Sequence, residues 1–184
     1  MPKSEQLQFK QHPTSLSSPT SPPPVPPKTG ATFDPTHTYR YSLWREWDAD
    51  APKVGFIMLN PSSADAKKND PTIRRCIGFA QSWGYGGLEV VNLFAYRATH
   101  LKDLLQATDP IGDKNDHYLI AAMQTANLLV VAWGNWGSLN QRDQAVLQLI
   151  SEHRQVCCLS LNQSGQPRHP LYVKSDTHPI PFRA

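Results

Sequence analysis

Polar and aromatic side chains follow each of four short apolar runs in the chain. They are amides, one imidazole, aromatic rings and arginines, which bind ligands through hydrogen bonds, ring faces and charge. In chain order the candidates are Asn60, Pro61 and Ser62 after the first run, Asn92, Phe94, Tyr96 and Arg97 at the second, Trp133 and Asn135 at the third, and Arg168 and His169 after the fourth. These residue types predict a binding or catalytic site, provided that the fold brings the four segments together.

The four apolar runs have the composition of buried parallel strands. They span residues 54–59, 88–93, 128–133 and 156–161. Runs that are apolar on both faces and alternate with helices are typical of a parallel sheet covered on both sides. We therefore predict an α/β fold, a three-layer sandwich around a four-stranded, mainly parallel sheet with right-handed crossovers.

Three helical patterns separate these runs. The first has Asp70 as N-cap and Pro71 at the first helical position, and it ends at the glycines of 84–87. The second covers roughly residues 113–127 and the third about 138–152, each with apolar residues at helical spacing.

Parallel strands bring their carboxyl ends to one edge of the sheet, where open α/β proteins bind ligands. Each candidate also has a simpler explanation. Asn60-Pro61-Ser62 suits an Asx turn, Asn92 needs only a structural hydrogen bond, Trp133 suits the core and His169 suits a surface turn. Their expected convergence on one edge favours a site.

Several kinds of site lack their sequence patterns. The chain contains neither a GxGxxG nor a GxxxxGK[ST] phosphate loop, and no GxSxG elbow for an acyl-transfer serine. Its histidines and cysteines lack the spacing of zinc ligands, and the three cysteines are interpreted as buried thiols. We expect no metal and no cofactor.

The N-terminal residues differ in composition from the rest. Nine of the 17 prolines fall within residues 1–37, which include the stretch SPPPVPPK. This composition predicts a disordered tail, either passive or docked to a partner, before one α/β domain at 38–184. The domain is expected to open with an edge strand at 39–47, where Tyr39, Tyr41 and Leu43 alternate with polar residues.

Charge and hydropathy indicate which partners and which cellular location to expect. The net charge of +3 permits a polyanionic partner without requiring one. No run of some 18 apolar residues would cross a bilayer, and no targeting signal is evident. We expect a cytoplasmic monomer without a membrane partner.

The segments YRYSLWREW, FIMLNPSSAD, NDPTIRRC, GYGGLEVVNLFAYRAT and GQPRHPLYV resemble an uncharacterised, mainly bacterial family, domain-of-unknown-function family 1643. The resemblance covers nearly all of residues 39–173. That family implies no activity.

A more remote resemblance does imply an activity. Asn-Pro in the first loop, Asn and Arg-Xaa-Thr at the second strand, Trp-Gly at the third and His-Pro after the fourth are similar to the uracil-DNA glycosylase superfamily. The resemblance implies the fold of that superfamily and hydrolysis of an N-glycosidic bond. It implies that Asn60 and Pro61 position the attacking water, that Asn92 reads the base edge, and that His169 stabilises the charge on the departing base.

The resemblance also suggests supporting roles and shows two departures. Phe94, Tyr96 or Trp136 would face the flipped base, and Arg74, Arg75, Arg97, Arg168 and Lys174 would contact phosphates. The first loop lacks the superfamily's carboxylate, and of the nearest acids Asp70 is expected to cap a helix, so Asp65 is the candidate. The serine that usually follows His-Pro and contacts the DNA backbone is absent, so a free nucleotide or modified nucleoside is the alternative substrate to DNA. The alternative is a non-catalytic module that binds nucleotide or nucleic acid.

Overall fold

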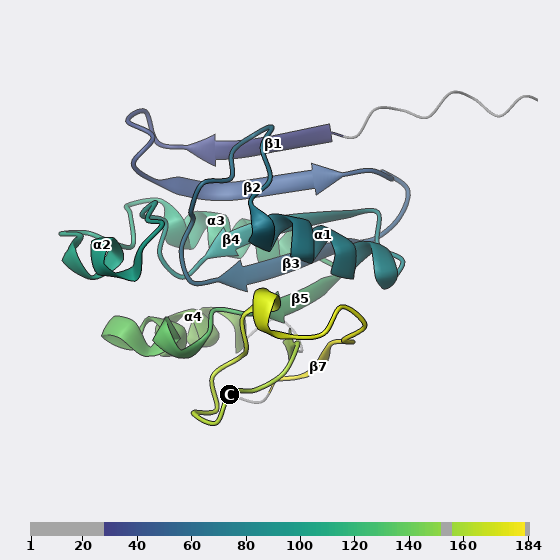
Figure 1. Cartoon of the computed structure of the whole chain (residues 1–184). Helices are drawn as coiled ribbons and strands as arrows, with labels where there is room; N and C mark the ends of the chain where they lie inside the picture. Colours follow the sequence, from purple (N-terminus) through teal and green to yellow (C-terminus); the bar gives the residue numbers. More distant parts are fainter. Residues whose placement is uncertain (1–27, 152–155, 183–184) are drawn as a thin grey trace, which may run out of the picture.

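The computed structural model describes residues 28–151 and 156–182. Within them the chain forms one seven-stranded mixed sheet with the strand order β1-β2-β4-β3-β5-β6-β7 (Figure 1). The strands are β1 (Lys28–Phe33), β2 (Arg40–Glu46), β3 (Lys53–Met58), β4 (Gly87–Asn92), β5 (Leu128–Val131), β6 (Cys157–Cys158) and β7 (Ile180–Pro181). The helices are α1 (Pro71–Ser82), α2 (Leu101–Gln106), α3 (Asn115–Thr125) and α4 (Arg142–Ser151), with 3₁₀ turns η1 (Asn135–Gln141) and η2 (Pro170–Tyr172).

The four apolar runs form the parallel centre of this sheet. β3 pairs in parallel with both β4 and β5, and β5 pairs in parallel with β6. The α/β class is therefore confirmed. The predicted count of four strands is wrong, because antiparallel strands extend the sheet through β1 and β2 on one side and β7 on the other.

Strand β2 is an interior strand, which corrects the prediction of an edge strand at 39–47. β1 covers its outer side along a register that runs from Lys28 opposite Glu46 to Phe33 opposite Arg40. As a result the polar residues of β2 are enclosed, and Arg40, Ser42 and Arg45 are all buried. The alternation in the sequence could not show this, because it depends on a pairing partner.

The predicted boundary of the tail at residue 37 is also wrong, since residues 28–33 form β1. This segment is ordered by pairing, which supplies backbone hydrogen bonds that its own composition does not predict. Residues 1–27, with all but the last residue of SPPPVPPK, lie outside the described residues, and so does any docking partner of that stretch.

Helices cover both faces of the sheet and enclose two cores. Val54, Phe56 and Met58 of β3 pack with α1 residues such as Phe79. Ile57 lies on the opposite face, in the core that α3 and α4 complete (Figure 1). The period-two alternation along β3 thus supplies both cores, and the expected three layers are present.

Helix α1 begins as predicted, with Asp70 as N-cap and Pro71 at its first position. The Asp70 Oδ1 accepts a hydrogen bond from Ile73 N at 2.8 Å. The third predicted helix starts later than expected, because residues 135–141 form η1, in which Asn140 has a φ of 53°. Helix α2 was not predicted.

Two further expectations concern single features. Cys76, Cys157 and Cys158 are all free thiols, and the last two pack against opposite cores. Among the described residues, no helix has both the length and the apolar character needed to span a membrane.

Candidate functional site

A cleft opens at the carboxyl end of β3, beside the N-terminus of α1. Its volume is about 240 Å³. Its walls come from the start of β2, the end of β3 and the loop after it, the first turn of α1, the turn at 98–99, the segment after β5 and the loop before η2. The lining residues are Arg40, Met58, Leu59, Asn60, Ser62, Asp70, Thr72, Ile73, Ala98, Thr99, Trp133 and His169. The carboxyl edge of the parallel strands therefore carries a cavity, as the topology predicts.

The cleft unites four of the expected site residues. Asn60, Ser62, Trp133 and His169 come from four separate segments of the chain and all line it. The sequence predicted that Asn60, Asn92 and His169 face a common cavity; Asn60 and His169 line this cleft, and Asn92 does not. The contacts of each side chain define what it can still offer a ligand.

Asn60 is held by the two segments that flank it. Its Nδ2 donates hydrogen bonds to Pro61 O at 3.0 Å and to Ala98 O at 2.8 Å. Ala98 N also donates to Pro61 O. Both amide protons are therefore engaged in fixing the loop, and Oδ1 remains as the acceptor available to a ligand or water.

His169 lies half-buried at the N-terminus of η2. Its Nδ1 accepts a hydrogen bond from Leu171 N at 3.3 Å, which assigns the proton of the neutral ring to Nε2. Burial lowers the pKa of His169, and the negative charge of Asp70 opposes this in part. The imidazole is thus a neutral ring that presents an Nε2–H donor.

The loop that carries His169 is tied to the sheet through its backbone. Gly134 N donates to Pro167 O at 2.8 Å, and Arg168 N donates to Ser160 O at 2.8 Å. These bonds join the segments after β5 and β6. They place the imidazole opposite the loop after β3, although His169 and Asn60 are far apart in the chain.

Trp133 forms one wall and is fixed by a chain of hydrogen bonds. Its Nε1 donates to Gln166 Oε1 at 2.6 Å, and Gln166 Nε2 donates to Asp143 Oδ2 at 2.6 Å. The indole is almost fully buried. It is therefore both a core residue and a wall of the cleft, so the interpretation as a core residue and the interpretation as a site residue each describe part of its position.

Two charged residues of the cleft were not predicted as site residues. Arg40 is 2 % exposed, and its Nη1 donates to Ala64 O at 3.0 Å. Burial lowers its pKa to about 10, so the guanidinium stays charged near neutral pH. Asp70 was predicted only as a helix cap, but it brings a carboxylate into the cleft. The Arg40 side chain lies beside the loop after β3 and the first turn of α1, which are distant in the chain, and this explains why the sequence pattern missed it.

Asp65, the carboxylate expected to be catalytic, lies outside the cleft lining. Its Oδ1 accepts hydrogen bonds from Lys67 N and Lys68 N. These backbone bonds lower the pKa of Asp65, those of Lys68 and Lys67 acting most strongly. Asp65 shapes the loop, and Asp70 is the acid that the structure brings to the site.

Asn92 is buried on the sheet face that Met58 occupies, since the two are register partners on neighbouring parallel strands. It is not among the residues that line the cleft. Within the described residues, neither Nδ2 nor Oδ1 of its side chain has a hydrogen-bond partner. A structural hydrogen bond therefore does not explain this amide.

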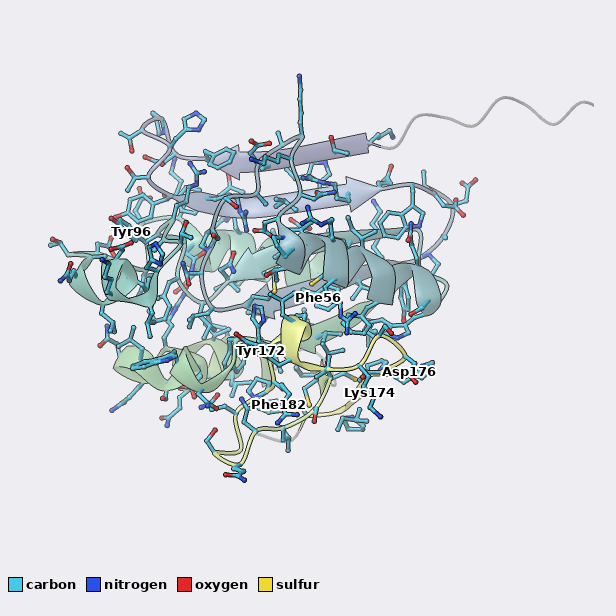
Figure 2. The ribbon with its side chains drawn as sticks, in the orientation of Figure 1. Phe56, Tyr96, Tyr172, Lys174, Asp176 and Phe182 are labelled. Atoms are coloured by element: carbon cyan, nitrogen blue, oxygen red, sulfur yellow. The ribbon has the colours of Figure 1, made fainter. Side chains whose placement is uncertain are left out.

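The other expected contacts fall into three places. Phe94 is fully buried in the core. Tyr96 and Arg97 line a more open groove of about 460 Å³ that adjoins the cleft and shares Ser62, Ala98 and Thr99 with it; we call it the side groove. Figure 2 shows Tyr96 well apart from Tyr172 of η2. Asn135 accepts hydrogen bonds from Asn162 Nδ2 and Ser164 Oγ, both at 2.8 Å, and Arg168 Nε donates to Asn162 Oδ1 at 3.1 Å.

The remaining candidate contacts also have defined surroundings. Arg74 and Arg75 bind the backbone carbonyls of Asn69 and Val173. Trp136 and Lys174 are exposed. None of these four lines the cleft or the side groove. Pro61 is buried, and its carbonyl joins the bonds that hold the loop.

A separate cavity of about 310 Å³ lies beside the ring stack of Tyr39, Tyr41 and Tyr118. Its acids are engaged locally. Asp113 accepts from Tyr41 Oη, and Asp109 accepts from the backbone N–H groups of residues 111 and 112. Within the described part of the chain, no group of three or more metal-binding side chains comes together.

The fold and the cleft define an α/β protein with a small polar cavity at the carboxyl edge of a mixed sheet. Residues 40–171 match the family described as "Protein of unknown function (DUF1643)", which is more than half of the chain, so the chain belongs to this family. Every residue that lines the cleft falls within the matched range. Neither the curated proteins nor the solved structures give a match, so the resemblance to uracil-DNA glycosylases stays a prediction.

Proposed function

We propose that the cleft binds a nucleobase and that the protein is a hydrolase that cleaves an N-glycosidic bond in DNA or in a nucleotide. The observation that carries this proposal is the meeting of Asn60, Asp70 and His169 in one cavity. Its volume of about 240 Å³ is below the roughly 300–1,000 Å³ of pockets for drug-sized ligands, which suits a single heterocycle. Trp133 supplies an aromatic wall of the kind that receives a flipped base.

The reaction needs an acceptor for a water proton and donors for the leaving base. The C1′–N bond breaks and its electron pair stays on the base nitrogen, while the water oxygen bonds to C1′. The water proton passes to the Asp70 carboxylate, and the departing base takes up a proton from solvent. Preorganised donors that face the developing negative charge supply the main stabilisation in such a step.

Three side chains are suited to these roles. Asn60 Oδ1 accepts a hydrogen bond from the attacking water, because Nδ2 is already engaged. Asp70 uses one oxygen in capping α1 and keeps the other for the proton. His169 donates its Nε2–H to a carbonyl oxygen of the base, since Nδ1 is occupied by Leu171 N.

The side groove suits the sugar and phosphate that remain attached. It continues from the cleft through Ser62 and Thr99, whose hydroxyl oxygens lie 3.4 Å apart. Arg97 also lines it, and its guanidinium carbon lies 5.0 Å from the centre of the Phe33 ring. Hydroxyl and guanidinium groups are common phosphate contacts, which position a substrate without reading its sequence.

Release of free base from a panel of modified oligonucleotides and nucleotides tests the proposal. Wild type should release at least one base, and Asn60→Ala and His169→Ala should abolish release while retaining binding. Gln163→Ala and His178→Ala are the controls, because both residues are exposed and lie outside the cleft and the side groove. Equal loss in the controls would contradict the assignment.

The second candidate is a module that binds nucleotide or nucleic acid without cleaving it. The engagement of both Asn60 amide protons in the loop favours it, since this leaves the residue a structural role. Tight binding of a panel member by wild type without any base release would establish the module and refute the hydrolase.

A further inference from the structure

Two buried arginines of strand β2 differ sharply in how their donors are satisfied. Arg45 donates to Asn69 Oδ1 through Nε, to Gly30 O and Trp44 O through Nη1, and to Asp65 O and Lys68 O through Nη2. Every nitrogen of its guanidinium is thus engaged. Arg45 shows what a structural buried arginine looks like in this protein.

Arg40 lacks such partners, although it is equally buried. Its one hydrogen bond within the described residues runs from Nη1 to Ala64 O. The Nε is enclosed and has no acceptor, and no acid lies within ion-pair distance of Arg40 in the described part of the chain. A buried cation with a single hydrogen bond is costly, so an arrangement of this kind favours an acceptor from a bound ligand.

The place of Arg40 identifies where that acceptor comes from. Arg40 lines the cleft, which also holds Asn60 and His169, whereas Arg45 does not line it. Asp70 lies in the same cleft, and its negative charge raises the pKa of Arg40 against the effect of burial, but no ion pair or hydrogen bond joins the two side chains within the described residues. The Arg40 guanidinium therefore has donors left for the acceptor groups of a ligand in the cleft.

We propose that Arg40 binds a carbonyl oxygen of the base and stabilises the negative charge that the base carries on departure. This inference rests on the proposed function for the choice of ligand. Arg40 offers donors alone, and His169 presents an Nε2–H donor. Both donor groups match the carbonyl oxygens and the deprotonated ring nitrogen of a departing base, whereas the acceptors of the cleft, Asn60 Oδ1 and the second Asp70 oxygen, are assigned to the attacking water.

Calorimetric titration of the full chain with free bases tests the inference without any turnover. The probes are uracil, which is neutral in mildly alkaline buffer, and 5-nitrouracil, which is largely anionic there. Wild type should bind 5-nitrouracil about 10-fold or more tighter than uracil, because hydrogen bonds to charged groups are the strong ones. Arg40→Gln should bring 5-nitrouracil and uracil to similar affinities.

Arg45→Gln is the matched control, since it removes the other buried arginine of the same strand and should keep the preference for the anion. Thermal melting shows whether each variant is folded. If Arg40→Gln fails to fold, titration of the wild-type protein at lower pH still tests the inference. Its affinity for 5-nitrouracil must fall as acidification neutralises the probe. A folded Arg40→Gln protein with an undiminished preference, or a wild type that binds none of the probes or does not prefer the anion, would overturn the inference.

The two proposals fail separately. Base release by a wild type that shows no anion preference would remove the role of Arg40 and leave the hydrolase. An anion preference that depends on Arg40 without base release from any substrate would keep the binding role of Arg40 and exclude hydrolysis.

Discussion

Asp70 combines two tasks at the residue scale, because it caps α1 and adds a carboxylate to the cleft. Asp70→Asn retains an oxygen for Ile73 N and removes the charge. Since asparagine is about as good an N-cap as aspartate, the free energy of unfolding should change by less than about 0.5 kcal/mol. We expect base release to be lost, as measured by the oligonucleotide assay alongside urea unfolding.

Asp70→Ala is the companion variant, which tests the capping of α1 together with the carboxylate. It removes both cap and charge, so unfolding should become easier by about 1 kcal/mol in addition to the loss of base release. If Asp70→Asn kept full base release, the carboxylate would have no role in the reaction.

At the residue scale, the titration of His169 is expected to make the stability of the protein depend on pH. Burial lowers its pKa in the folded state below the ordinary value of about 6.5, so the unfolded chain binds the proton more readily. His169 therefore does not reduce the stability of the folded protein above about pH 6.5, the pKa of the unfolded chain. It lowers that stability as the pH falls from this value toward the pKa of His169 in the folded state. Protonation also converts Nδ1 into a donor, which breaks its bond from Leu171 N.

We expect His169→Gln to show a weaker loss of melting temperature than wild type between neutral and mildly acidic pH. The imidazole signal of His169 in a proton NMR titration should have its midpoint below the ordinary value. A midpoint above that value would show that the charged form is favoured in the cleft.

At the element scale, η1 supports the cleft through a glycine. A Cβ at Gly137 would lie 2.0 Å from Cδ1 and 2.3 Å from Nε1 of Trp133. Because that indole is buried and bonded to Gln166, Gly137→Ala should destabilise the fold by roughly 1–3 kcal/mol through overpacking. The displaced wall should also weaken binding in the cleft, which calorimetry with 5-nitrouracil would detect.

Gly78 of α1 is the matched glycine for this test. It is exposed in the helix interior, and a Cβ there would meet no atom within 4 Å. Gly78→Ala should stabilise the protein by roughly 0.5–1 kcal/mol, because alanine costs less conformational entropy in a helix. Destabilisation by this change, seen in thermal melting, would show that α1 is more constrained than its surroundings indicate.

At the scale of the whole molecule, β1 completes the sheet over a strand that carries buried charges. Removal of residues 1–37 would delete β1 and with it Gly30 O, an acceptor for Arg45. Compared with a chain that lacks only residues 1–27, this shorter chain should lose at least about 1–3 kcal/mol, the cost of leaving a buried donor unsatisfied. Urea unfolding of the two chains measures the difference, and equal stability would contradict a structural role for β1.

The sequence by itself determined the local features of this protein. The four apolar runs became the parallel centre of the sheet, and Asp70 with Pro71 marked the start of α1. Polar residues beyond the strands identified Asn60, Ser62, Trp133 and His169, because parallel strands end at a common edge. These signals depend on neighbours in the chain, which a sequence displays directly.

Only the tertiary structure decided which side chains are enclosed and what they contact. The loop after β3 and the start of α1 enclose Arg40, which its own alternation placed outside, and a capping turn brings Asp70 into the cleft in place of Asp65. Asn92 proved to be buried without a partner and outside the cleft lining. Burial and hydrogen bonding arise from segments that are distant in the chain, so no local pattern records them.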